Sequence, residues 1–231
     1  MISSEREYFS LDKNSFLKKW YKEEYARVTY QGDQGLVQKL MHKSIERGAK
    51  RLQINKTLEI GANQGEHLPY VQGNTSYFST DNNLDLISKD SKIDTFVDAA
   101  NLPFFDNSFD RVLHMCLLHH VLEPEKVLEE MRRVTKIGGT ISIFLSHDPG
   151  LLFRFGRMVG PLRDSGKRGL RNVKRLVDAR DHINHVYGLK TLIKHIYRYD
   201  EINCKTFPFN YMPIDFSLWS IWQIKKSQHQ R

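Results

Sequence analysis

The 231-residue sequence predicts an α/β fold built on a doubly wound, mostly parallel sheet. Short apolar runs alternate with helical patterns from residue 57 to residue 147, and such an alternation forms a parallel sheet with right-handed crossovers. The first run ends in a glycine-containing turn, and Asp81 follows 20 residues after Gly61. Two β-rich runs close the chain with no helix between them, which predicts a terminal antiparallel pair of strands.

The individual elements follow from hydrophobic spacing and from turn residues. Leu36, Leu40 and Ile45 recur at helical spacing, and a second apolar helical face is predicted over residues 124–135. The predicted strands cover residues 57–60, 77–80, 95–97, 111–114, 140–145, 202–209 and 217–225. A basic, helix-rich stretch separates the fifth of these strands from the sixth.

Composition is that of a soluble globular domain, with 40% hydrophobic and 27% charged residues. No stretch approaches the roughly 18 apolar residues that a membrane span needs. Residues 1–7 carry acidic charges and lack an apolar core, so they do not resemble a secretory signal. Cys116 and Cys204 lie among apolar residues and are expected to be free thiols. We therefore expect a cytoplasmic protein.

The net charge of +8 is compatible with nucleic acids, membrane surfaces and phosphorylated substrates as partners. The excess gathers between Arg163 and Arg180, where seven basic residues face two acidic ones. This stretch is either a solvated helix face or a clamp on phosphate or carboxylate, since guanidinium groups bind both bidentately. The clamp residues would be Arg168, Arg171 and Arg175.

Five motifs lie at strand ends, where open α/β sheets bind their ligands. They comprise Glu59–Gly65, Asp81, Asp98–Phe104 with Ser108–Leu113, Leu118–Val121 with Glu129–Val134, and Ile137–Thr140. In this order and spacing they resemble the class I S-adenosylmethionine-dependent methyltransferases, in particular the small-molecule, type 11-like branch. The resemblance covers about residues 58–146. A looser likeness, around residues 182–185 and the last strands, is to bacterial methyltransferases of sugars, polysaccharides or natural products.

The resemblance implies a Rossmann-like sheet of seven strands in the order 3-2-1-4-5-7-6, with the last strand antiparallel and a helical insertion after the fifth. Segment 217–225 would then lie inside the sheet, and its few polar residues suit a buried strand. We expect one domain over residues 1–231. Its parts are an N-terminal helical segment (1–50), a cofactor-binding core (57–147), an acceptor-binding helical insertion (148–198) and a C-terminal strand pair (202–226).

S-adenosyl-L-methionine is the cofactor that the resemblance implies. Its contacts would come from Glu59, Gly61, Ala62, Asn63 and Gly65 at the amino-acid end, Asp81 at the ribose, Asn82, Asp98 and Ala99 at the adenine, and Met115 near the sulfur. Asp98 could instead only cap its loop. The family usually has a glycine where this chain has Asn63, and asparagine tolerates the left-handed backbone better than other non-glycine residues.

Transfer of the methyl group requires alignment of the acceptor and, for a hydroxyl acceptor, a general base. The candidates are His119 and His120 after the fourth strand and His147 after the fifth. In the alternative interpretation, one histidine of the pair packs under the cofactor and the other caps the following helix. No metal is expected, because His182 and His185 lack a well-placed carboxylate and Asp181 is taken to point elsewhere.

The predicted reaction is methylation of a hydroxyl or amine on a small polar acceptor, such as a sugar or nucleotide sugar, which would be anionic if the arginines bind it. RNA methylation is the main alternative, favoured by charge, but Met115-Cys116-Leu117 lacks the prolines of nucleic-acid methyltransferase motifs. Nucleic acid is therefore not an expected partner. A non-catalytic cofactor-binding module is less favoured because Glu59, Asp81 and Asp98 are present. The oligomeric state is left open.

Overall fold

A computed structural model describes residues 11–25, 33–49, 54–73, 75–83, 92–159 and 171–228. Its strands are β1 (Lys56–Ile60), β2 (Ser76–Asp81), β3 (Thr95–Phe96), β4 (Phe109–Met115), β5 (Thr135–Ser146), β6 (Glu201–Phe207) and β7 (Trp219–Lys225). Its helices are α2 (Lys13–Glu23), α4 (Asp33–Ala49), α5 (Pro124–Val134), α6 (Leu151–Val159), α7 (Arg171–Asp181) and α8 (Val186–Ile196), with short 3-10 turns η1 (Leu68–Tyr70), η3 (Leu117–His119) and η6 (Ile214–Phe216).

The seven strands form one sheet in the order β3-β2-β1-β4-β5-β7-β6, which confirms the predicted topology. Strands β1 to β5 are parallel to one another, and β7 is antiparallel to both β5 and β6. The insertion of β7 inside the sheet is explained by its side chains: Trp219 to Trp222 are all buried. A strand covered on both faces has to be apolar along its length.

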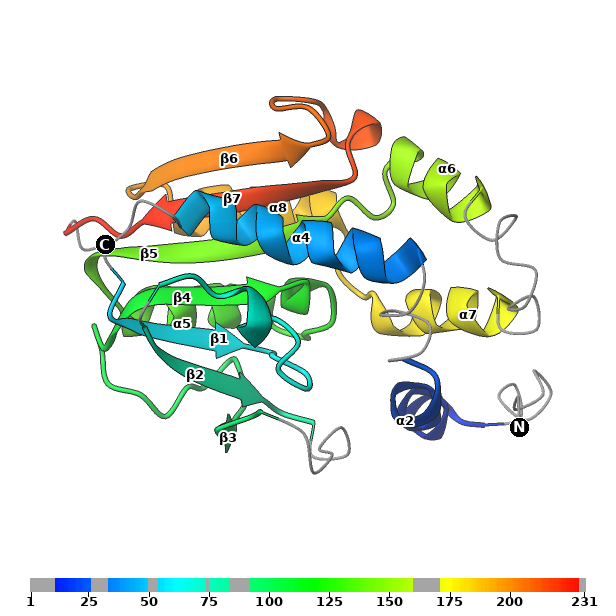
Figure 1. Cartoon of the computed structure of the whole chain (residues 1–231), viewed down its shortest axis with the longest axis horizontal. Helices are drawn as coiled ribbons and strands as arrows, with labels where there is room; N and C mark the ends of the chain where they lie inside the picture. The colour runs from blue at the N-terminus through cyan, green and yellow to red at the C-terminus, as the bar shows by residue number, and fades with distance from the viewer. Residues whose placement is uncertain are drawn as a thin grey trace.

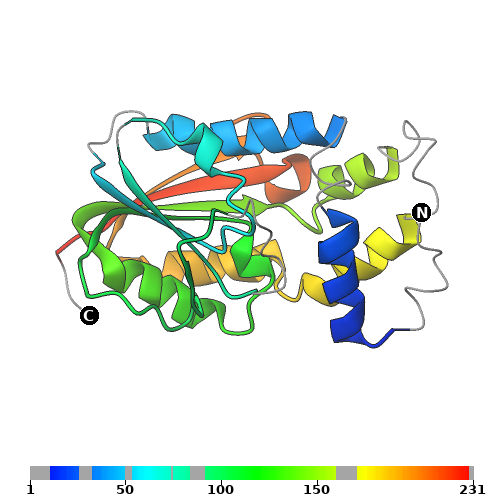
Figure 2. The same ribbon diagram turned by 60° about the horizontal axis from the view of Figure 1, so that its bottom comes forward.

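Helices cover both faces of the sheet (Figures 1 and 2). Helix α4 lies on one face, and α5 and α8 lie on the other. Helix α5 buries Val127, Leu128 and Met131, the side chains whose spacing predicted it. The main core lies between this helix layer and the inner strands β4 and β5.

Two predicted strand ends differ from the structure for local reasons. The strand predicted over residues 202–209 ends at Phe207, because Pro208 has no N–H to donate to the ladder. Strand β5 begins at Thr135, earlier than predicted, and its pairing with β4 is irregular between Phe109 and Arg111.

Cys116 and Cys204 are both free, as predicted. Among the described residues no helix has the length and apolarity of a membrane span.

Helices α2 and α7 pack against each other beyond the carboxyl ends of β1 and β2 (Figure 1). Asp12 caps α2 by accepting the amides of Asn14 and Ser15, at 3.0 and 3.2 Å. Phe16 and Trp20 of α2 are buried in a small core of their own with α7. An element from the start of the chain therefore lies beyond the carboxyl ends of these parallel strands.

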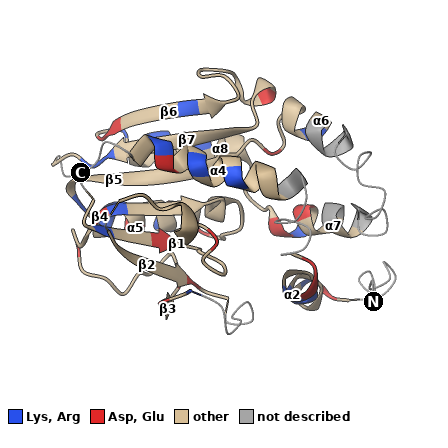
Figure 3. Cartoon of the chain, in the orientation of Figure 1, with Lys and Arg blue, Asp and Glu red and all other residues tan. Residues whose placement is uncertain are grey.

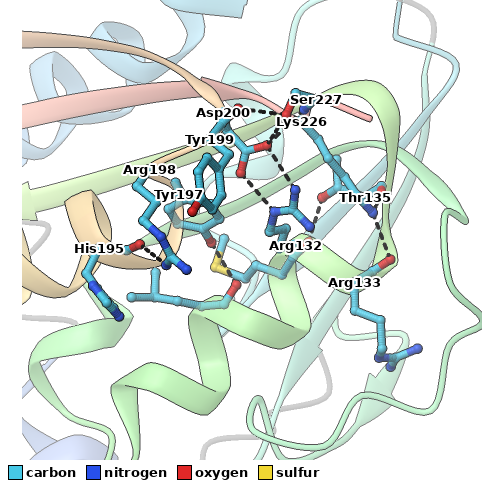
Figure 4. A network of polar contacts seen from close by, with 12 residues as sticks. Arg132, Arg133, Thr135, His195, Tyr197, Arg198, Tyr199, Asp200, Lys226 and Ser227 are labelled. Atoms are coloured by element: carbon cyan, nitrogen blue, oxygen red, sulfur yellow. Dashed lines mark hydrogen bonds and ion pairs between the residues drawn. The ribbon is translucent and has the colours of Figure 1, made fainter. Parts of the chain in front are cut away.

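The opposite end of the sheet is held by a polar network around Asp200 (Figure 4). Arg132 of α5 donates two hydrogen bonds to the Asp200 carboxylate, at 2.8 and 3.1 Å. The amide of Ser227 donates to the same carboxylate at 2.8 Å, and Lys226 donates to the carbonyl oxygen of Thr135 at 2.7 Å. These contacts connect α5, the start of β5 and the segment after β7.

We predict that Asp200→Ala lowers the free energy of unfolding by about 2–3 kcal/mol, because it removes a buried carboxylate and leaves its donors unpaired. The matched control is Asp106→Ala, since the Asp106 side chain is 68% exposed in its ion pair with Arg133 and exposed pairs contribute below about 1 kcal/mol. Urea unfolding measures both. Equal losses of unfolding free energy in the two variants would contradict the stabilising role given to the Asp200 network.

Candidate active site

The turn after β1 has the backbone conformation that close approach of a ligand requires. Gly61, Asn63 and Gly65 have φ angles of 67°, 53° and 84°. A Cβ atom at Gly61 would lie 2.7 Å from the side chain of Leu117 and would be strained at this positive φ, so the position favours glycine. Asn63 adopts the left-handed conformation expected of an asparagine in place of the usual glycine.

Asp81, the last residue of β2, holds this turn in place. Its carboxylate accepts the Asn63 amide at 2.8 Å and the Asn83 amide at 2.9 Å. The side chain of Asn63 donates to Glu66 at 2.7 Å. The two loops that follow β1 and β2 are thus joined at the carboxyl edge of the sheet by one carboxylate.

Glu59 is a buried carboxylate directly beneath the turn, 1% exposed. It accepts a hydrogen bond from the Tyr77 hydroxyl at 2.6 Å. Burial raises the pKa of Glu59 above its usual value, although His67, Tyr77 and Arg111 oppose this. An ammonium group placed beside Glu59 would stabilise its ionised form.

The other predicted cofactor residues lie at the same edge. Asp98 is exposed and accepts the Ala100 amide at 2.9 Å, so it does cap its loop. Ala99 is buried, Asn82 is exposed next to Asp81, and Met115 packs against the apolar cluster of Phe144 and Trp219. The contacts of all these residues with a cofactor stay predictions.

A buried polar network that the sequence analysis did not identify lies between α4 and the sheet. Arg111 of β4 donates to Glu46 of α4 at 2.6 Å, and both side chains are 1% exposed. His67 donates to the same Glu46 oxygen at 3.0 Å and lies 2.8 Å from His42. The available signal was Arg111 itself, since a charged side chain within a buried strand needs a buried partner.

His119 and His147, two of the three candidate bases, are committed to structural hydrogen bonds. His119 is fully buried; its Nδ1 donates to the Asn184 carbonyl oxygen at 2.8 Å, and its Nε2 lies 3.1 Å from the Ser146 hydroxyl. His147 is 2% exposed and its Nδ1 lies 2.7 Å from the Ser217 hydroxyl. Burial lowers the pKa of each to about 4.

His120 has a different environment. Its side chain is 27% exposed, and its Nδ1 lies 2.9 Å from a carboxylate oxygen of Asp181. The neighbouring His182 has its Nδ1 3.1 Å from Asp148. The expectation that His182 lacks a well-placed carboxylate was therefore wrong, whereas the Asp181 carboxylate contacts His120 and Tyr21. Helix α7 ends at Asp181. The amides of Ile183 and Asn184 then donate to the His119 carbonyl oxygen, and these hydrogen bonds hold the segment after α7 against η3.

A cavity of about 380 Å³ lies between these two groups of residues. Its lining consists of Asn14, Ser15, Leu17, Lys18 and Tyr21 of α2, Asn83 after β2, and Asp181 at the end of α7. Asn83 connects the cavity to the Asp81 loop, and Asp181 connects it to His120. The cavity is therefore lined by a neighbour of Asp81 and by the carboxylate next to the candidate base.

The predicted acceptor arginines are only partly covered by the structure. Arg168 lies outside the described residues, and Arg171 and Arg175 belong to α7 with side chains outside the described part. Figure 3 shows acidic residues on both α2 and α7, the helices next to the cavity. No group of three or more metal-ligating side chains is found among the described residues.

Comparison with known proteins agrees with this geometry. Residues 58–143 match the family described as methyltransferase domain. The plantazolicin methyltransferase BpumL, solved in complex with SAH, has a TM-score of 0.64 and 14% identity, over 96% of this chain and 98% of that chain. Residues 58–143 are thus similar in sequence to the methyltransferase domain family, and the chain has the fold of a solved methyltransferase.

Relatives of this methyltransferase domain match over part of their length. A demethylmenaquinone methyltransferase of Paenarthrobacter aurescens is 39% identical over 94 residues, which are 38% of this chain and 37% of that protein. A phosphatidylethanolamine N-methyltransferase of Cereibacter sphaeroides is 30% identical over 118 residues, which are 46% of this chain and 54% of that protein. The chain thus spans about a third to a half of these relatives' lengths.

We predict that acid destabilises the methyltransferase domain through His119. The unfolded side chain binds a proton near pH 6.5 and the folded one near pH 4, so unfolding takes up a proton between these values and stability falls as the pH falls. The loss is at most about 3 kcal/mol by pH 4. Urea unfolding at a series of pH values should show a shallower slope for His119→Gln. The control is His195→Gln, at an exposed histidine; an unchanged slope in His119→Gln would contradict the prediction.

Proposed function

We propose that the chain is an S-adenosylmethionine-dependent methyltransferase that methylates a small-molecule acceptor. The observation that carries this proposal is the left-handed turn of Gly61, Asn63 and Gly65, tied by Asp81 to the end of β2 and opening beside a cavity. The family of the domain supports it. The cofactor supplies an electrophilic methyl group on a sulfonium, and the protein has to bind it, orient the acceptor and exclude water.

The residues present fit this cofactor. Gly61, Asn63 and Gly65 hold the turn in the left-handed conformation, and the buried carboxylate of Glu59 suits an ammonium group. Asp81 has a second lone pair on each oxygen beyond those that accept the Asn63 and Asn83 amides, and these can accept ribose hydroxyls. Asp98 and Ala99 would bind the adenine, and Met115 would lie near the sulfur.

For the acceptor we propose a hydroxyl or amine of a small polar molecule, bound between the cofactor and residues 148–198. A sugar or nucleotide sugar fits the basic residues of this segment, with Arg168, Arg171 or Arg175 on an anionic group. The cavity beside Asn83 and Asp181 supports a small acceptor at this place.

An apolar acceptor such as a quinone or lipid is the second candidate. Leu151 and Phe155 of α6 are each 57% exposed, and so is Phe216 of η6, which contacts α6. Tyr211, before η6, is 89% exposed. The names of the two curated relatives point to the same class. Partition of a labelled methyl product into an aqueous or an organic phase distinguishes the two candidates.

We predict that Asp81→Ala weakens binding of S-adenosylmethionine and of S-adenosylhomocysteine at least tenfold, about 1.4 kcal/mol. Isothermal titration calorimetry measures the affinity. The matched control is Asp110→Ala, which removes a carboxylate at the opposite edge of the sheet, where it accepts the Lys56 amide at 2.8 Å. The control should keep the wild-type affinity. A wild-type protein that binds NAD and neither adenosyl ligand would contradict the proposed function.

A further inference from the structure

Three segments that are distant in the chain meet at the carboxylate of Asp181. Tyr21 of α2 donates its hydroxyl to Oδ2 of Asp181, the last residue of α7. His120, which directly follows η3, has its Nδ1 2.9 Å from the same oxygen. Tyr21 and Asp181 both line the cavity beside Asn83. The Asp181 carboxylate thus contacts both the Tyr21 hydroxyl and the His120 imidazole, and it lines the cavity of the proposed acceptor site.

We propose that Asp181 and Tyr21 are positioning residues that hold His120 with its proton on Nδ1 and its Nε2 free to act as the general base. This proposal deepens the proposed function and rests on it. Nδ1 of His120 lies within ion-pair distance of the Asp181 carboxylate, and a carboxylate accepts and does not donate, so Asp181 favours a hydrogen on Nδ1. The second nitrogen of the neutral ring is then an acceptor.

The proton transfer that this arrangement allows is balanced. A lone pair on the acceptor oxygen or nitrogen forms the bond to the methyl carbon, and the electron pair of the breaking carbon–sulfur bond stays on sulfur. Nε2 of His120 takes the proton that the acceptor loses, and Asp181 stabilises the resulting imidazolium. The same arrangement of nucleophile, general base and orienting carboxylate recurs on unrelated folds.

The charge states of Asp181 and Tyr21 agree with these roles. Burial alone would raise the pKa of Asp181, but the hydrogen bonds from His120 and Tyr21 hold it below its usual value, so the carboxylate is ionised. Burial and the Asp181 charge raise the pKa of Tyr21 well above its usual value, so its hydroxyl remains a donor. Tyr25 and Asp178 act on Tyr21 in the same direction.

A second imidazole packs against His120. The ring of His182 meets it edge-on with centroids 4.7 Å apart, and His182 itself lies 5.3 Å from the ring of His119. Asp148 is the carboxylate next to His182, at 3.1 Å. Each partly buried imidazole, His120 and His182, therefore has its own carboxylate. The hydrogen bond from Tyr21 joins the Asp181 carboxylate to α2 and the cavity.

The test is the tautomer of His120 in the full chain, read from ¹⁵N chemical shifts of labelled histidine at a pH where the ring is neutral. His120→Gln assigns the signal. We expect Nδ1–H in the wild type, loss of this tautomer in favour of Nε2–H in Asp181→Ala, and its return in Asp181→Glu. The matched control is Asp148→Ala, which should alter His182 and leave the His120 tautomer as in the wild type.

Tyr21→Phe is the second variant, and it keeps the aromatic ring in the α2–α7 core. It should retain the Nδ1–H tautomer while shifting the His120 Nδ1 resonance, because Asp181 loses one of its two donors. An Nε2–H tautomer in the wild type, or no change of tautomer in a folded Asp181→Ala protein, would overturn the proposal. These spectra need neither cofactor nor acceptor, so their failure would leave the Asp81 binding test of the proposed function untouched.

Discussion

A buried ion pair between Arg111 and Glu46 is the constraint on which the rest of the structure depends. Arg111 lies on the central strand β4, and removal of one partner from a buried pair costs about 3–5 kcal/mol because the other charge remains unpaired. Burial would raise the pKa of Glu46, but its contacts with His67 and Arg111 lower it to about 2. The pair therefore fixes α4 over one face of the sheet.

Hydrogen bonds connect this ion pair to the edge of the sheet where the cofactor is proposed to bind. His67 connects Glu46 to the loop that follows the Gly61–Gly65 turn, and Asp81 connects the same turn to the end of β2. Glu59, one strand away from Arg111, is kept buried under the turn. A site that has to bind an adenosyl group at a strand edge gains its precision from such rigid elements, with the loops held by hydrogen bonds to side chains on the strands.

The sheet order and the position of the cofactor edge could be predicted because their signals are local. Strand ends, the glycine turn and Asp81 follow one another along the chain, and Asn63 adopts the left-handed conformation that its residue type allows. The pairs of Arg111 with Glu46 and of Tyr21 with Asp181 join residues 65 and 160 positions apart, so no spacing rule reveals them. Pairing of His120 with Asp181 depends on where α7 ends, which the sequence around residues 171–181 does not specify.

A crystal structure of the protein with S-adenosylhomocysteine tests the central claim most directly. The account predicts the ribose hydroxyls within hydrogen-bond distance of the Asp81 carboxylate and the ammonium next to Glu59. It also places the sulfur toward the cavity that Tyr21, Asn83 and Asp181 line. A ligand bound elsewhere in the molecule, or bound at this edge with its sulfur turned away from that cavity, would contradict it.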